Sequence, residues 1–372
     1  MTTPNDLLPV GLEDALPRRA AAITRAMRTI LTQMDLHGYD RVRPPLIEFE
    51  RSLSDRMDGG APRRMVRFTD PESLRTLALR SDITVQVGRI AATSMAHASR
   101  PLRLCYAGEV AMLKADQLDP ARQRLQLGAE LIGSDSVEAA IEAVTVALDA
   151  LEAAGLSGLS VDFTLPDLVD TLAQSAMPLA PQDRAAVRRE LDMKDAGGLK
   201  AVGGAAYLPL LYATGPFEDA VDKLAAIDAK GALASRIKGL RDIAAAIGKR
   251  ARLTLDPSER HGFEYQSWFG FTLHADGARG SIGRGGTYAI KGSDEAATGF
   301  SLYMEPILEA LSDYNGPDKE RSAVFLPHGH DRSVAARLRD EGWRTIAAIT
   351  EADDAAQFGC SHRLIDGVPQ PL

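Results

Sequence analysis

The feature that most restricts the fold of this chain is a pair of adjacent prolines, Pro44 and Pro45, which closely follows a long helical pattern. Residues 17–37 predict an amphipathic helix, with Pro17 in its first turn, Gly38 at its end and apolar residues at helical spacing, namely Ile23, Met27, Ile30, Leu31 and Met34. Proline lacks an amide hydrogen and fixes its φ angle, so residues 39–50 must be extended. Such a strand fits a sheet edge or an interface between chains.

Strand and helix patterns then alternate along the chain. We expect helices over 83–93 and from Ser136 to Gly155, and strands over 253–255 and 263–273. Between them, residues 167–250 are rich in Ala, Leu and charged residues, which predicts a helical insertion. The glycines after the last of these strands predict a structural turn and not a phosphate loop, since no Lys-Ser/Thr follows them; they are Gly280, Gly283, Gly285, Gly286 and Gly292.

The end of the chain has the pattern of a small separate domain. It predicts a strand over 323–326, a helix over 331–340 that stops at Gly342, a strand over 345–349, and then a short helix and a last strand. His328 and His330 have no acidic or cysteine partner in the pattern, so we expect surface or capping residues and no metal site. We predict an α+β protein with one domain over 1–316, including the insertion, and a small α/β domain over 317–372.

Composition excludes several classes of protein. Hydrophobic residues make up 45% and charged residues 25%, as in ordinary globular proteins. The 43 Lys and Arg against 51 Asp and Glu give a net charge of −8, so a general nucleic-acid binder is not expected. Two distant cysteines, Cys105 and Cys360, indicate neither a disulfide framework nor a zinc site. Without a signal-peptide pattern or a membrane-span pattern, we expect a cytoplasmic protein.

Several segments occur in the order seen in histidyl-tRNA synthetases and their paralogues, over roughly residues 8–315. Gly38-Tyr39 with Pro44, Pro45 and Glu48 resembles the first class II motif, which implies a class II antiparallel sheet flanked by helices and a homodimer. Leu79-Arg80-Ser81-Asp82-Ile83-Thr84 resembles Leu-Arg-Pro-Glu-x-Thr, and Arg103 to Gly133 resembles the second class motif with the strand after it. Gly262-Phe263-Glu264-Tyr265 resembles the Arg-Gly-Leu-Asp-Tyr-Tyr signature, and Gly299-Phe300-Ser301 resembles the third class motif.

This resemblance implies a histidine-binding pocket. Its candidate residues are Asp82, Thr84, Gln126, Glu130, Glu264 and Tyr265. Asp82 stands where the family has Glu, and the shorter acid can still pair with an ammonium group. Gln126 and Glu130 are four residues apart, so on a strand both side chains lie on one face. The alternative interpretation is a solvated polar face.

The departures from the family pattern concern catalysis. The alignment puts Met112 in place of the second-motif arginine and Pro306 in place of the third-motif arginine. At the histidine signature, His261 replaces an arginine, although Arg260 is adjacent. The lost guanidinium groups would meet the phosphates of ATP, so we expect adenylation to fail and no catalytic residues to remain.

Among paralogues with this pattern, the resemblance implies a regulatory subunit of ATP phosphoribosyltransferase, which joins a short-form catalytic subunit in the first step of histidine biosynthesis. A homodimer within a hetero-oligomer, histidine as the effector, no cofactor and no tRNA binding are expected. Two alternatives stay open: an active synthetase-like enzyme that has recruited another arginine such as Arg284, and a stand-alone sensor of histidine or tRNA.

Overall fold

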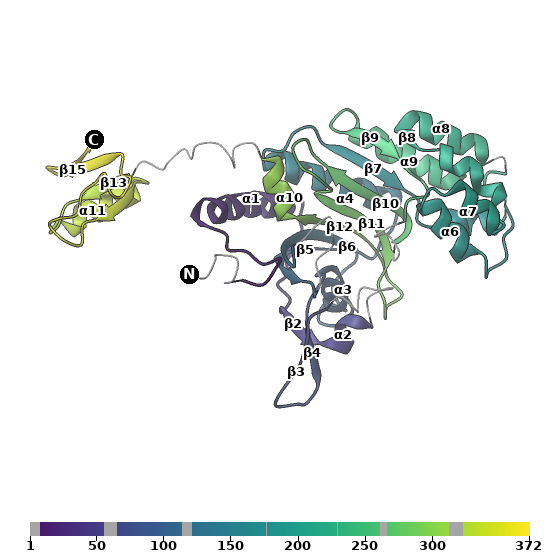
Figure 1. Cartoon of the computed structure of the whole chain (residues 1–372), viewed down its shortest axis with the longest axis horizontal. Helices are drawn as coiled ribbons and strands as arrows, with labels where there is room; N and C mark the ends of the chain where they lie inside the picture. Colours follow the sequence, from purple (N-terminus) through teal and green to yellow (C-terminus); the bar gives the residue numbers. More distant parts are fainter. Residues whose placement is uncertain are drawn as a thin grey trace. The chain divides into compact units, whose positions relative to one another are not determined.

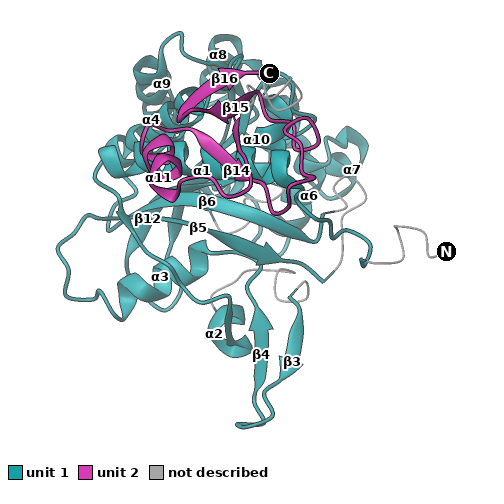
Figure 2. Ribbon diagram, turned by 90° about the vertical axis from the view of Figure 1, so that its left-hand side faces the viewer, with its two compact units in different colours: residues 1–314 teal, residues 315–372 magenta. Residues whose placement is uncertain are grey.

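The computed structural model describes residues 8–55, 65–113, 121–175, 177–228, 230–260, 266–311 and 323–372. The chain forms two compact units, Met1–Tyr314 and Asn315–Leu372, shown in two colours in Figure 2. Each unit has its own sheet and core. In the described part of the chain, no helix is both long enough and apolar enough to cross a membrane.

A nine-stranded sheet organises the first unit. Its order is β1-β5-β6-β12-β11-β10-β7-β9-β8. The strands from β5 to β7 pair with one another in antiparallel fashion, whereas β1 is parallel to β5 and β9 is parallel to β7. The bounds are β1 Asp40–Arg41, β5 Leu102–Ala111, β6 Gln123–Ile132, β7 Ser160–Thr164, β8 Gly215–Pro216, β9 Arg252–Leu255, β10 Gln266–His274, β11 Gly283–Ala289 and β12 Ala296–Tyr303. The predicted class II synthetase-like sheet flanked by helices is confirmed.

Helices pack on the two faces of this sheet. On one face lie α1 Pro17–Leu36, α4 Val137–Ala153 and α10 Met304–Ala310, and their apolar sides form the main core with the sheet. Ser136 caps α4 by accepting a hydrogen bond from the amide of Ala139. On the other face, α3 Thr84–Ala92 covers a smaller core around Leu104 and Ile132. The helices predicted at 17–37, 83–93 and 136–155 are therefore confirmed within two residues at every end.

The predicted insertion is mainly helical and lies beside β8 and β9 (Figure 1). Its helices are α5 Leu168–Ala173, α6 Arg184–Asp192, α7 Ala196–Ala201, the 3₁₀ helix η3 Ala205–Tyr212, α8 Phe217–Ile227 and α9 Ala234–Ile247. The only strand within its described residues is β8, which pairs with β9 and ties the insertion to the large sheet.

The extended segment after α1 supplies two short edge strands. β1 pairs with β5 at one edge of the large sheet, and β2 Ile47–Phe49 pairs with β4 Thr76–Leu79 in a separate sheet of order β2-β4-β3. β3 is Arg67–Thr69, and α2 Glu50–Ser54 follows β2. Pro44 and Pro45 lie between these two strands, where strand pairing does not require a backbone N–H group.

The second unit differs from its prediction in two respects: a predicted helix is absent, and a hairpin of two strands stands where one strand was predicted. β13 Ala323–Leu326, α11 Arg332–Asp340 and β14 Arg344–Ala347 were expected. The predicted short helix after β14 is wrong, because the Asp353 carboxylate accepts the amides of Ile349 and Thr350 and makes a turn instead. Two strands follow, β15 His362–Ile365 and β16 Val368–Pro371, joined by Asp366-Gly367 with φ of 49° and 78°.

Candidate functional site

Four of the six predicted ligand residues come together between α3 and β6. The side-chain amide of Gln126 donates to Asp82 Oδ1 at 2.9 Å, and its oxygen accepts from the backbone amide of Ile83 at 3.0 Å. Asp82 Oδ1 also accepts from the backbone amide of Thr84 at 2.9 Å. The start of α3 is thereby fastened to the sheet. Glu264 and Tyr265 lie outside the described residues.

Glu130 lies deepest in this group. It is 1% exposed, and it accepts hydrogen bonds from the hydroxyls of Tyr106 at 3.2 Å and Tyr288 at 2.8 Å. No Lys, Arg or His among the described residues forms an ion pair with it. Burial raises the pKa of Glu130 to about 8; the nearby Asp82 carboxylate adds to this, while the hydrogen bonds oppose it. A buried acid without a cation is typical of a binding or catalytic site.

Tyr106, Tyr288 and Ser301 extend these contacts into a continuous hydrogen-bond network. The sequence analysis did not propose these three residues as ligand contacts. Ser301 Oγ accepts from Gln126 Nε2 at 2.8 Å and is hydrogen-bonded to the Tyr106 hydroxyl at 3.0 Å. That hydroxyl also bonds Thr84 Oγ1 at 3.0 Å. In the sequence, these residues are marked only by their place in segments that resemble the synthetase motifs. We call the whole set the polar cluster: Asp82, Thr84, Tyr106, Gln126, Glu130, Tyr288 and Ser301.

Glycines on the neighbouring strands make room for the polar cluster. Gly128 and Gly299 lie opposite Ser301 and Glu130 in the strand registers. A Cβ on Gly128 would overlap the Tyr106 hydroxyl, and one on Gly299 would overlap Glu130 Oε2. Gly283, Gly285 and Gly286 lie within β11 and not in a turn, so the turn prediction is wrong for these three. Glycine is required there because side chains and backbone of adjacent strands occupy the space of a Cβ.

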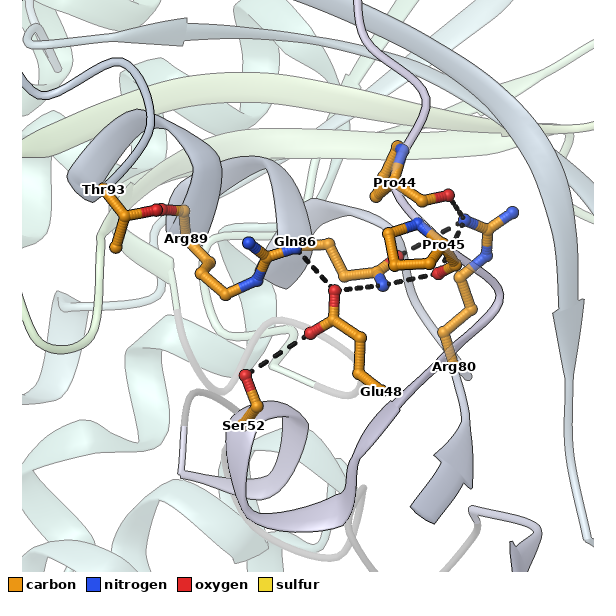
Figure 3. Close-up of polar contacts among 8 residues, drawn as sticks. All are labelled: Pro44, Pro45, Glu48, Ser52, Arg80, Gln86, Arg89 and Thr93. Carbon is orange, nitrogen blue, oxygen red and sulfur yellow. Dashed lines mark hydrogen bonds and ion pairs between the residues drawn. The ribbon is translucent and has the colours of Figure 1, made fainter. Parts of the chain in front are cut away.

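A second hydrogen-bonded group holds the proline segment against α3 (Figure 3). The guanidinium of Arg80 donates to the carbonyl oxygen of Pro44 at 2.9 Å and to that of Glu109, on β5, at 2.8 Å. Glu48 accepts from Arg89 Nη2 at 2.5 Å and from Gln86 Nε2 at 2.9 Å. The first-motif segment is thus bonded directly to the helix that begins at the polar cluster.

The two positions at which the alignment predicts lost synthetase arginines lie just after β5 and in the first turn of α10. Met112 follows β5, and its carbonyl accepts a hydrogen bond from Arg122 at 3.3 Å. Pro306 lies in the first turn of α10, next to Glu305, whose pKa is raised by burial. Arg284 pairs in register with Ser301, so it shares a face with the polar cluster. His261 lies outside the described residues.

The described residues contain no group of three or more His, Cys, Asp or Glu side chains placed to hold a metal ion. His330 Nδ1 is hydrogen-bonded to the Pro327 carbonyl at 3.1 Å, and the neighbouring Asp331 caps α11 by accepting from the amide of Ser333. The chemistry at the polar cluster is therefore that of hydrogen-bond donors and acceptors around a buried acid.

Comparison with known proteins identifies the family. The family model for histidyl-tRNA synthetase matches residues 11–307. The ATP phosphoribosyltransferase regulatory subunit of Rhodospirillum centenum is 41% identical, with 98% of this chain and 96% of that protein covered. The regulatory subunit of Paramagnetospirillum magneticum is also 41% identical, with 96% of each chain covered. The chain belongs to the ATP phosphoribosyltransferase regulatory subunits.

Solved structures agree with this assignment at the level of the fold. A Bacillus halodurans protein described as an ATP phosphoribosyltransferase regulatory subunit/histidyl-tRNA synthetase superimposes with a TM-score of 0.79, at 22% identity and 95% coverage of both chains. The histidyl-tRNA synthetase of Nostoc gives a TM-score of 0.78 at 16% identity, with 98% of this chain and 92% of that chain covered. The regulatory-subunit family thus has the fold of a synthetase.

Proposed function

We propose that this chain activates a short-form catalytic subunit of ATP phosphoribosyltransferase, and that histidine bound at the polar cluster inhibits the assembly. The observation that carries the proposal is the polar cluster, taken together with the departures of the sequence from the synthetase motifs. The groups expected to bind an amino acid stand together around Asp82 and Glu130, while the sequence alignment puts Met112 and Pro306 in place of the phosphate-binding arginines. The chain would thus keep the groups that bind histidine and lack the arginines that adenylation requires.

The lost arginines argue against a working synthetase. Each guanidinium group stabilises charge that develops on the phosphates in the transition state, and removing one such donor costs about 10² to 10³ in rate. Two losses together leave little useful adenylation. Arg284 is a described cation that shares a face with Ser301, and it is the first residue to test if activity is found.

An assembly with a second copy of this chain is supported by the small sheet. Phe49, Leu77 and Phe68 lie opposite one another across β2, β4 and β3, so their side chains share one face. Phe49 and Phe68 are 38% and 40% exposed, and neighbouring Ile47 is 43% exposed. An apolar sheet face of this kind is typical of a protein interface. The resemblance of the Pro44–Glu48 segment to the first class II motif favours a homodimer here.

The deciding experiment measures phosphoribosyl-ATP formation by a short-form catalytic subunit with and without this chain, over a range of histidine concentrations. Histidine-dependent pyrophosphate exchange by this chain alone is measured in parallel. We expect activation, inhibition by histidine and no exchange. Exchange without activation would show an enzyme, and activation without histidine inhibition would remove the effector part of the proposal.

The homodimer is tested separately by sedimentation of the wild type and of Phe68→Glu. A charge on the apolar face should convert the dimer to a monomer. A wild type that sediments as a monomer at micromolar concentration, or a variant that remains a dimer, would place the interface elsewhere.

A further inference from the structure

The outer side of α1 carries a concentration of positive charge. Four arginines and one aspartate give this helix a charge of +3, in a chain whose net charge is −8. Arg18, Arg25 and Arg28 are exposed, while Arg19 is paired with Glu13. Arg18 precedes Arg25 by about two helical turns, and Arg28 follows it by about one turn, so the three side chains lie along one side of α1. We call these three residues the arginine face.

The arrangement of charges on the arginine face is unfavourable within α1 itself. Neither Arg25 nor Arg28 forms an ion pair with a residue that the structure describes, and like charges three residues apart on a helix repel one another. Arg18 lies in the first turn, which contains no acidic residue and where the helix dipole disfavours a cation. Packing does not require these arginines either, because the buried side of the helix is apolar and consists of Ala22, Ala26, Ile30, Leu31 and Met34.

The composition of the arginine face fits a protein partner that carries acidic side chains. Leu36 lies eleven residues after Arg25, which is about three turns and therefore the same side of α1, and it is 71% exposed. α1 contains no lysine, and protein interfaces are likewise enriched in arginine and depleted in lysine. A nucleic acid fits less well, because the negative charge of the whole chain repels phosphate groups.

The arginine face is separate from the small sheet, which is proposed above as the surface of the homodimer. α1 packs on the large sheet together with α4 and α10, whereas β2, β3 and β4 form a sheet of their own. In both views the small sheet extends away from the body of the first unit, and α1 lies on that body (Figures 1 and 2). The two surfaces can therefore serve two different partners.

We propose that the arginine face is the docking surface for the catalytic subunit, and that it pairs with acidic side chains of that subunit. This inference rests on the proposed activating function and names the surface through which the function acts. Guanidinium groups pair with carboxylates through charge-assisted hydrogen bonds, and complementary charges speed the association of two proteins and favour the correct partner. Docking of this kind weakens as the salt concentration rises, because salt screens exposed charges.

The test is phosphoribosyl-ATP formation by a short-form catalytic subunit, measured over a range of concentrations of this chain. Arg25→Glu and Arg28→Glu together reverse two charges and should raise the half-activating concentration at least about tenfold, with the maximal rate unchanged. Arg25→Lys with Arg28→Lys keeps the charges and should restore most of this loss. Lys200→Glu with Lys223→Glu, at exposed positions of the insertion, changes the net charge equally and is the matched control. Thermal unfolding verifies that each variant is folded.

A second measurement on the wild type requires no variant. Between about 0.01 M and about 0.15 M salt, the distance over which charges are screened falls from about 30 Å to about 8 Å. The half-activating concentration of the wild type should therefore rise at least about fivefold over this range, and that of the charge-reversed variant should rise less. A wild type whose half-activating concentration does not change with salt would overturn the inference.

The outcomes separate the inference from the function on which it rests. If the charge-reversed variant activates the catalytic subunit as the control does, the inference is overturned and the activating function stands. If that variant sediments as a smaller species than the wild type, the arginine face belongs to an interface between copies of this chain. If the wild type binds transfer RNA and the variant does not, the occupant is a nucleic acid, and each of these two results overturns the inference. If the wild type does not activate the catalytic subunit, the proposed function fails, and the docking surface fails with it.

Discussion

The pKa of Glu130 predicts a specific dependence of stability on pH. This pKa is raised from an ordinary value of 4.5 to about 8, chiefly because the carboxyl group is buried. The folded state therefore holds the proton more tightly than the unfolded chain. The stabilisation is complete below pH 4.5 and is lost as pH rises through about 8. At about 1.4 kcal/mol per pH unit, the loss approaches 5 kcal/mol as an upper bound.

The perturbation that isolates this effect is Glu130→Gln, which keeps the shape and removes the titration. We expect the free energy of unfolding of the variant, minus that of the wild type, to rise steadily between pH 5 and 8 and to level off above. Urea unfolding followed by Trp268 fluorescence reports on the first unit if Trp343 of the second unit is replaced by Phe in both proteins.

Glu72→Gln, in the exposed turn between β3 and β4, is the control and should give a flat difference. A difference for Glu130→Gln that is also independent of pH would refute the reasoning. Such a result would mean that burial does not raise the pKa of the Glu130 carboxyl group.

Three further perturbations test the packing around the site. Gly299→Ala should destabilise the fold by about 1–3 kcal/mol in urea unfolding, because the added methyl overlaps the Glu130 carboxyl, and it should weaken histidine binding in calorimetry. Arg80→Met should cost about 3 kcal/mol, because carbonyl oxygens bonded by a guanidinium that is 6% exposed lose their donor; a loss below 1 kcal/mol would contradict this. The hydrogen bond to Asp162 raises the pKa of His274 above 6.5, so this pair stabilises the fold at low pH and loses its effect as pH rises through that pKa. His274→Gln should remove that part of the pH dependence, and identical pH profiles would count against it.

The sequence predicted those parts of the fold that depend on local pattern. α1, α3 and α4 follow from apolar spacing together with Pro17, Ser136 and Gly155, because periodicity and capping act within a few residues. The strand position of Gln126 and Glu130 was likewise readable, since four residues along a strand return to one face.

Features set by contacts between distant segments were not readable in this way. The glycines at 283–286 resemble a turn by composition, but they lie in a strand. Leu302, Phe271, Gln266 and the backbone of β10 and β12 fill the space that their side chains would need. The pair Asp366-Gly367 is a local signal for a hairpin turn, and the sequence analysis did not use it to predict the hairpin of β15 and β16. Gln266 directly follows the segment that resembles the histidine signature, but its unpartnered side-chain oxygen could not be predicted, because it depends on the pairing of β10 with β11.

The contacts of α3 show how a ligand at the polar cluster can affect a distant surface. Asp82 and Thr84 join the first turn of this helix to β6, whereas Gln86 and Arg89, further along it, bond Glu48 on β2. β2 is an edge strand of the small sheet with the exposed apolar face. A displacement of α3 would therefore break hydrogen bonds at both the polar cluster and the small sheet. Allosteric coupling of 1–3 kcal/mol, the usual range, corresponds to the loss of about one or two such bonds to charged groups.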